Sequence, residues 1–154
     1  MEKVQGASRL ISSQSQGVLC TNSVKHSGYP FGSVTPFAIG AKGSPIFLFS
    51  SMAVHTKNLI ADPKASLLVS AESAEGELLA GARANILGSI LPLPQNEIDS
   101  ARHAYLLAHP AAHQWVTFSD FKFFGMEITE IYYVGGFGVM GWVSAADYST
   151  VASR

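Results

Sequence analysis

The residues best suited to chemistry in this sequence follow a short apolar run. Ser50 and Ser51 end the run at residues 47–49, and Thr56 and Lys57 come within the next six positions. This order predicts a buried strand that turns directly into a helix, where the first backbone N–H groups lack acceptors and carry partial positive charge. Hydroxyl groups and an ammonium at such a turn suit a phosphate dianion. The alternative, that Ser51 only caps the helix, leaves the other three side chains unexplained.

Two further residues are candidates for a ligand site. Arg83 is the arginine inside a strand-like run, where its guanidinium suits a phosphate or carboxylate; a surface-facing arginine is the alternative. Trp142 follows the glycine-rich stretch Gly135–Gly138 and either stacks on a flat ring or fills a barrel core. The glycines lack a following helix and a Walker lysine, so we predict a tight turn and no nucleotide-binding loop.

The histidines do not predict a metal site. His109 and His113 are four positions apart, but Pro110 breaks the helical pattern between them and no third ligand joins them. For His55, beside the predicted turn, a binding and a structural role are both open. Without a nucleophile elbow or a carboxylate pair in an apolar setting, we assign no catalytic residue. Demanding chemistry would therefore come from a cofactor.

Composition limits the class of protein. The 154 residues predict one domain, residues 1–154, and the net charge of −1 argues against nucleic acid or anionic lipid as partners. Charged residues make up only 14%, against about 25% in typical domains, while hydrophobic residues reach 47%. Such a small domain cannot readily cover its own surface. We therefore expect a homodimer with a large apolar interface, the alternative being a poorly soluble monomer.

The sequence predicts a cytoplasmic protein. The first residues lack the apolar core of a signal peptide, and the longest uncharged run, residues 131–146, is too short and too broken by glycine to span a bilayer. The lone Cys20 lies in an apolar run, where it is expected to be a small core residue.

The apolar pattern predicts mainly β structure. Helices are expected over residues 2–14, 52–62 and 97–108; strands are expected over 17–23, 32–39, 46–50, 65–71, 78–91 and 121–134, with a short last strand ending at 142–143, and 72–77 form a polar loop. Pro36 has no N–H, so its strand must lie at an edge or be interrupted. Because helices and strands do not alternate, we predict a mostly antiparallel barrel of six or seven strands with appended helices, an α+β fold.

Several separated blocks resemble the pyridoxamine 5′-phosphate oxidase-like FMN-binding split-barrel family, closest to its branch of haem-utilisation proteins. The blocks are Gly28–Phe37, Ala53–Leu59, Asp62–Leu67, Tyr105-Leu106 with His109-Pro110, Asp120-Phe121, and Val134–Gly138 with Trp142.

This resemblance implies a homodimer of six-stranded antiparallel split β-barrels with flanking helices and FMN at the subunit interface. It places the FMN phosphate on the turn with Ser50, Ser51, Thr56 and Lys57, and Asn58 close by. It lays the backbone of Ser33, Val34 and Thr35 along the isoalloxazine ring, with Arg83 and Trp142 approaching from the partner subunit.

Differences from the family narrow the expected function. No arginine- and histidine-rich segment follows Trp142, as the true oxidase has, so pyridoxamine phosphate oxidation is not expected. Haem-utilisation proteins often carry their ligating histidine in a further C-terminal region, beyond the end of this sequence. Lys57 stands where relatives often have arginine. The main hypothesis is an FMN-dependent oxidoreductase; the alternatives are a haem-binding or haem-degrading protein and a non-catalytic dimeric module.

Overall fold

The chain folds into one curled antiparallel sheet with helices at its ends. The computed structural model describes residues 1–71, 76–136 and 138–153. Within these residues eight strands pair in the order β2-β1-β5-β6-β7-β4-β3, and β8 pairs with β7. The strands are β1 (Gln16–Asn22), β2 (Pro30–Pro36), β3 (Ala38–Ile39), β4 (Pro45–Ser50), β5 (Lys64–Ser70), β6 (Arg83–Pro92), β7 (Phe121–Val134) and β8 (Met140–Ser144).

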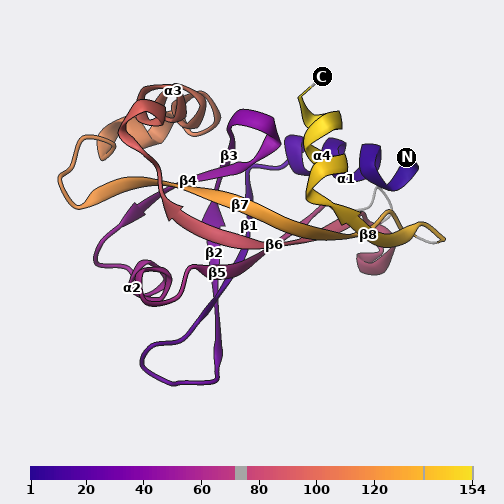
Figure 1. The fold of residues 1–154 in the computed structure, drawn as a ribbon, viewed down its shortest axis with the longest axis horizontal. Coiled ribbons are helices and arrows are strands. Elements are labelled where there is room, and N and C mark those ends of the chain that lie inside the picture. Colours follow the sequence, from indigo (N-terminus) through magenta and orange to yellow (C-terminus); the bar gives the residue numbers. More distant parts are fainter. Residues whose placement is uncertain (72–75, 137, 154) are drawn as a thin grey trace.

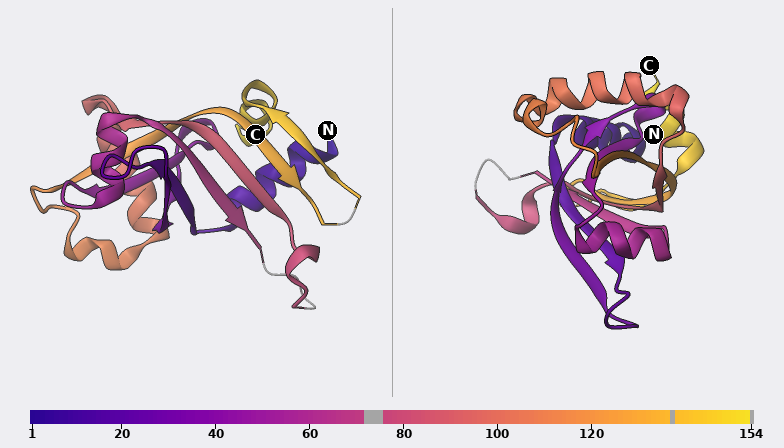
Figure 2. Two further views of the ribbon diagram at one scale, coloured as in Figure 1. Left: turned by 90° about the horizontal axis from the view of Figure 1, so that it is seen from below. Right: turned by 90° about the vertical axis from the view of Figure 1, so that its left-hand side faces the viewer.

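Helices lie at both ends of the curled sheet (Figures 1 and 2). The α-helices are α1 (Glu2–Ser13), α2 (Val54–Ala61), α3 (Ile98–Ala108) and α4 (Ala145–Ala152), and short 3-10 turns are η1 (Ala41–Gly43), η2 (Leu78–Ala80), η3 (Gln95–Glu97) and η4 (Pro110–Gln114). In Figure 1, α1 and α4 lie beside β8, whereas α2 and α3 lie at the opposite end. The β1–β2 hairpin projects away from the body of the sheet (Figure 1).

The main core lies between the concave face of the sheet and α1. Leu19, Leu67 and Ile86, from three adjacent strands, are fully buried there, and each such side chain contributes about 1.5–3 kcal/mol. Helix α1 approaches closely because Gly6 has no side chain: a Cβ there would lie 2.5 Å from the Tyr133 hydroxyl. A smaller cluster on the other face packs α3 against β4 and β7.

The predicted α+β fold, an antiparallel sheet with flanking helices, is confirmed, and β7 has its predicted bounds. Pro36 lies in β2, which is an edge strand as required. The described residues contain eight strands, not six or seven, because the predicted strand 32–39 is interrupted at Phe37 and gives β2 and β3. Of the predicted loop at residues 72–77, residues 72–75 lie outside the described part.

Two segments differ from the sequence prediction. Strand β6 begins at Arg83 and not at residue 78, because η2 and Gly81 precede it. Helix α4 was not predicted. Its signal was Ser144, whose hydroxyl accepts the Asp147 backbone N–H at 3.1 Å and caps the helix. No described helix combines the length and apolar character needed to cross a membrane.

Candidate functional site

The turn between β4 and α2 forms as the sequence predicts. Residues 45–49 of β4 are all buried, so the chain leaves the core only at Ser50. The Ala53 N–H donates to the Ser50 carbonyl at 3.2 Å, and α2 begins at Val54. In the described structure the N–H groups of Val54, His55 and Thr56 have no protein acceptor. The start of α2 therefore offers three unused donors and the positive end of a helix dipole.

Thr56 is the unusual residue of this turn. Its side chain is 2% exposed, and its hydroxyl has no hydrogen-bond partner among the described residues. Buried hydroxyl groups are normally hydrogen-bonded, because an unsatisfied one loses its bonds to water without replacement. Lys57 beside it is exposed, and it makes no ion pair in the part of the chain that the structure describes. A buried donor and a free cation thus lie at one helix start.

Ser50 already uses its hydroxyl within the protein. The hydroxyl donates to the Asp120 carboxylate at 3.1 Å and accepts the Met52 N–H at 3.2 Å. The neighbouring Ser51 N–H donates to the Asp120 carbonyl at 2.7 Å, while the Ser51 side chain is exposed. Asp120 contacts this turn, but it was given no role from the sequence, because it lies 70 positions from Ser50 in the chain.

Asn58 holds α2 to the sheet. Its amide donates to the Thr21 hydroxyl at 3.0 Å and its carbonyl oxygen accepts the Val24 N–H at 3.0 Å, with the side chain 1% exposed. Both halves of the amide are therefore satisfied inside the protein. Asn58 therefore fixes the position of α2, and its side chain has few free hydrogen-bonding groups left for a ligand.

The predicted ring-binding segment lies in the edge strand β2. The Thr35 hydroxyl is buried and donates to the Ser33 carbonyl at 3.1 Å, whereas the Val34 side chain is 74% exposed. Val34 pairs with Val18 of β1, which in turn pairs with Leu68 of β5. These side chains share the outer face of the sheet, opposite the main core.

Arg83 and Trp142 lie far from the turn within one chain. Arg83 donates to the Leu79 carbonyl at 3.3 Å, and Trp142 packs edge-on against Tyr132 with ring centroids 5.1 Å apart. Ser50 pairs with Phe121 at the start of β7, eleven residues before Tyr132. At about 3.3 Å per residue this separation is about 36 Å of strand. A single chain does not bring the two groups together.

The structure excludes one of the two alternatives for Trp142, and Gly136 lies in the predicted turn. Trp142 is 52% exposed and does not fill a barrel core. Gly136, with φ of +96°, requires its glycine, but a Cβ there would meet the Ala80 carbonyl oxygen at 2.9 Å. The close approach at this turn is thus to the protein's own backbone, and Phe137 lies outside the described residues.

The two half-buried histidines have structural contacts. The His109 Nε2 lies 2.8 Å from the Phe37 carbonyl oxygen and its ring packs on Tyr105. The His55 ring packs edge-on against Phe49 with centroids 4.7 Å apart, and burial lowers the pKa of this imidazole. Burial thus favours the neutral form of His55 over the charged form.

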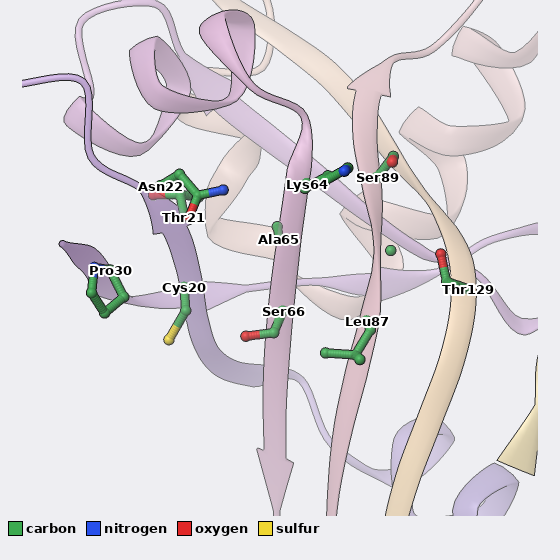
Figure 3. A pocket seen from close by; sticks show the side chains of 11 residues that line it. Cys20, Thr21, Asn22, Pro30, Lys64, Ala65, Ser66, Leu87, Ser89 and Thr129 are labelled. Carbon is green, nitrogen blue, oxygen red and sulfur yellow. The ribbon is translucent and has the colours of Figure 1, made fainter. Parts of the chain in front are cut away.

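A cavity of about 450 Å³ opens on the outer face of the sheet (Figure 3). Its polar lining includes Cys20, Asn22, Lys64, Ser66, Ser89 and Thr129, from β1, β5, β6 and β7. Cys20 is half-buried in this wall, so the prediction that it is a core residue is wrong. Sequence reasoning missed the cavity because strand pairing alone assembles its wall from separate segments.

The outer face also carries a continuous cross-strand row. Register pairs connect Val34, Val18, Leu68, Asn85, Tyr132 and Trp142 in that order across five neighbouring strand contacts. Four of these side chains are apolar and between 37% and 74% exposed. Exposed apolar side chains thus lie at both ends of the row, with Asn85 and Tyr132 between them.

A curled antiparallel sheet with flanking helices defines the split-barrel fold. The chain belongs to the CREG beta-barrel family, which it matches over residues 1–150. This assignment confirms the resemblance to FMN-binding split barrels on the branch of haem-utilisation proteins.

Two curated proteins illustrate the similarity. The chloroplastic non-canonical heme oxygenase HOZ of Arabidopsis thaliana is 43% identical over 120 residues, which cover 78% of this chain and 36% of that protein. Protein CREG2 of Mus musculus is 26% identical over 164 residues, covering 96% of this chain and 56% of that protein.

Solved structures support the fold. A heme binding protein from Mycobacterium smegmatis superimposes with a TM-score of 0.90 and 31% identity over 96% of this chain and 60% of that one. A FAD-binding protein from Mesorhizobium loti, with a TM-score of 0.66 and 15% identity over 81% of this chain and 87% of that one, shares the fold. The chain spans only 36% to 60% of HOZ, CREG2 and the mycobacterial protein.

Proposed function

We propose that the protein binds FMN, with the phosphate on the β4–α2 turn, and acts as a flavin-dependent oxidoreductase. The observation that carries the proposal is the buried Thr56 hydroxyl, which has no partner among the described residues. A phosphate oxygen would accept its hydrogen bond, together with the free N–H groups of α2. Lys57 would neutralise part of the phosphate charge, and the exposed Ser51 hydroxyl would complete the donor set.

The proposal includes a second copy of the chain. Arg83 and Trp142 lie about 36 Å of strand away from the turn, so they reach the same ligand only from a partner subunit. The exposed apolar row that ends at Val34 and Trp142 is the surface that a partner would cover. Low charge content favours the same arrangement. A chain with few charged residues cannot readily cover its own surface, and a stable interface would remove about 800 Å² of that surface from each partner.

FMN, when bound, would supply one- or two-electron redox chemistry that no described side chain provides. The chain would hold and orient it. Thr56 and Lys57 would fix the phosphate, and the apolar side chains on the outer face of β1 and β2 would exclude water from the ring. The turn would thus set affinity, and the subunit interface would set access to the flavin.

Titration of the purified protein with FMN and with riboflavin, followed by flavin fluorescence, tests the phosphate assignment. Lys57→Glu should weaken FMN binding about 100-fold, since it changes the local charge by two units near a dianion. Its riboflavin affinity should not change. Lys42→Glu on η1, which packs against α4, is the charge-matched control. Equal FMN affinity in wild type and Lys57→Glu would refute the assignment.

Light scattering tests the subunit arrangement separately. The wild type should have the mass of a dimer, and Val34→Glu should shift it toward the monomer, because a buried carboxylate would face the apolar row. The FMN affinity of Val34→Glu should fall as the dimer is lost, while its far-UV circular dichroism spectrum should stay unchanged. A monomeric wild type that still binds FMN would exclude the interface site.

Haem binding is the second candidate function. The mycobacterial neighbour is a heme binding protein and HOZ a heme oxygenase. In this chain, exposed His26 lines a cavity of about 330 Å³ with Tyr29 and Phe31 on the β1–β2 hairpin. An exposed imidazole beside aromatic rings suits haem iron and its flat macrocycle.

A haemin titration distinguishes the two candidates. If this second function holds, haemin should shift its Soret band on adding wild-type protein. His26→Ala should abolish the shift, and His103→Ala, on α3, should retain it. A Soret shift that is equally strong in His26→Ala would exclude His26 as the iron ligand.

A further inference from the structure

Asp120 lies immediately before β7 and faces the end of β4. Its carboxylate accepts the Ser50 hydroxyl at 3.1 Å, and its backbone carbonyl accepts the Ser51 N–H at 2.7 Å. Ser50 is the register partner of Phe121, the residue after Asp120. Asp120 therefore spans the first two residues of the turn and fixes them to β7.

This contact changes what Ser50 can offer a ligand. A serine hydroxyl has one proton, and here it is donated to Asp120, while a lone pair accepts the Met52 N–H. Ser50 has no donor left for a phosphate oxygen. The donors remaining at the turn are Ser51, Thr56, Lys57 and the first N–H groups of α2.

The contact also places a negative charge beside the proposed phosphate-binding site at the β4–α2 turn. Two charged groups at the turn are the Lys57 ammonium on α2 and the Asp120 carboxylate before β7. Burial lowers the pKa of His55 on α2 and so favours its neutral form. Lys122 of β7 pairs with Phe49, whose side chain lies on the opposite face of the strand from Ser50. At the turn, the Lys57 cation is thus opposed by the Asp120 anion.

We propose that Asp120 sets how tightly this turn holds phosphate, so that FMN exchanges with solution and is not permanently retained. The inference rests on the proposed function. The Asp120 carboxylate repels the phosphate dianion and withdraws the Ser50 donor, whereas Lys57 attracts the dianion. Asp120 is a positioning residue, because it acts through the turn and through charge.

Three variants separate its charge from its hydrogen bonds. Asp120→Asn keeps an oxygen that accepts the Ser50 hydroxyl and removes the charge, whereas Asp120→Ala removes both. Asp147→Asn on α4, at the other end of the molecule, is the control for loss of a carboxylate. The measured quantity is the ratio of the riboflavin to the FMN dissociation constant, which isolates the phosphate contribution.

Asp120→Asn should raise this ratio about tenfold, the size expected for removing one like charge near a partly exposed dianion. High salt should reduce the gain. Asp120→Ala should raise the ratio at least as much as Asp120→Asn, because it also frees the Ser50 hydroxyl for a phosphate oxygen, while the bond from the Ser51 N–H to the main-chain carbonyl of residue 120 is retained. Asp147→Asn should leave it unchanged.

The outcomes separate this inference from the function on which it rests. A wild type that does not prefer FMN to riboflavin would overturn the phosphate site itself. A wild type that prefers FMN, with an unchanged or lower ratio in Asp120→Asn, would overturn only the role of Asp120. Equal tightening of FMN and riboflavin by Asp120→Asn would also overturn it, because such a change does not act through the phosphate.

Discussion

Replacing Thr56 by valine should stabilise the ligand-free protein while weakening its binding of FMN. Valine has nearly the shape of threonine but carries a methyl group in place of the hydroxyl. The Thr56 hydroxyl is buried and without a partner among the described residues. An unsatisfied buried polar group costs about 1–3 kcal/mol. Removing it should therefore raise the free energy of unfolding by about that amount.

The expected change is large enough to measure. For a chain of 154 residues, each kcal/mol corresponds to about 2–4 °C in Tm. Thermal unfolding without ligand should thus show Thr56→Val melting roughly 2–12 °C above the wild type. Thr56→Ser, which keeps the hydroxyl and loses the methyl group, should melt below the wild type, since it leaves a small cavity.

Saturating FMN should narrow the difference in Tm between Thr56→Val and the wild type. A hydrogen bond to a charged acceptor contributes about 1.5–3 kcal/mol, so Thr56→Val should bind FMN at least tenfold more weakly and gain less Tm from saturating FMN. Riboflavin, without the phosphate, should bind both proteins equally. A lower Tm for Thr56→Val without ligand would mean that the hydroxyl already has a partner, and the reasoning would be refuted.

Three other predictions concern stability. Asn58→Ala should lower the free energy of unfolding by about 2–4 kcal/mol in urea denaturation, since both hydrogen bonds of its buried side-chain amide are lost. A loss under 1 kcal/mol would contradict its positioning role. Tyr148→Phe should cost about 1–2 kcal/mol because the 2.7 Å bond to the Gly43 carbonyl disappears, and an unchanged urea midpoint would contradict this. Burial raises the pKa of Tyr105 and of Tyr148 to about 12 from 10.0, so the stability they contribute is full below pH 10 and is lost as pH rises toward 12; equal urea midpoints at pH 9 and pH 11.5 would refute it.

The sequence by itself determined the features that depend on neighbouring residues. The alternation over Phe121–Val134 located β7 with its observed bounds. The β4–α2 turn was also predictable, because Ser51, Thr56 and Lys57 are close in sequence and a strand followed directly by a helix start brings them together. Local periodicity and helix-terminus chemistry act over a few residues, so no long-range contact was needed to find them.

Only the tertiary structure decided which of these groups remain available. Ser50 is bound by Asp120, 70 positions away, and Asn58 by Thr21, 37 positions away. The outer cavity is assembled from five strands, and the exposure of Trp142 follows from its place in β8. Such contacts depend on strand order and register, where a shift of one residue turns every side chain to the other face. Register is set by the packing of the whole sheet, and no short segment of sequence contains that information.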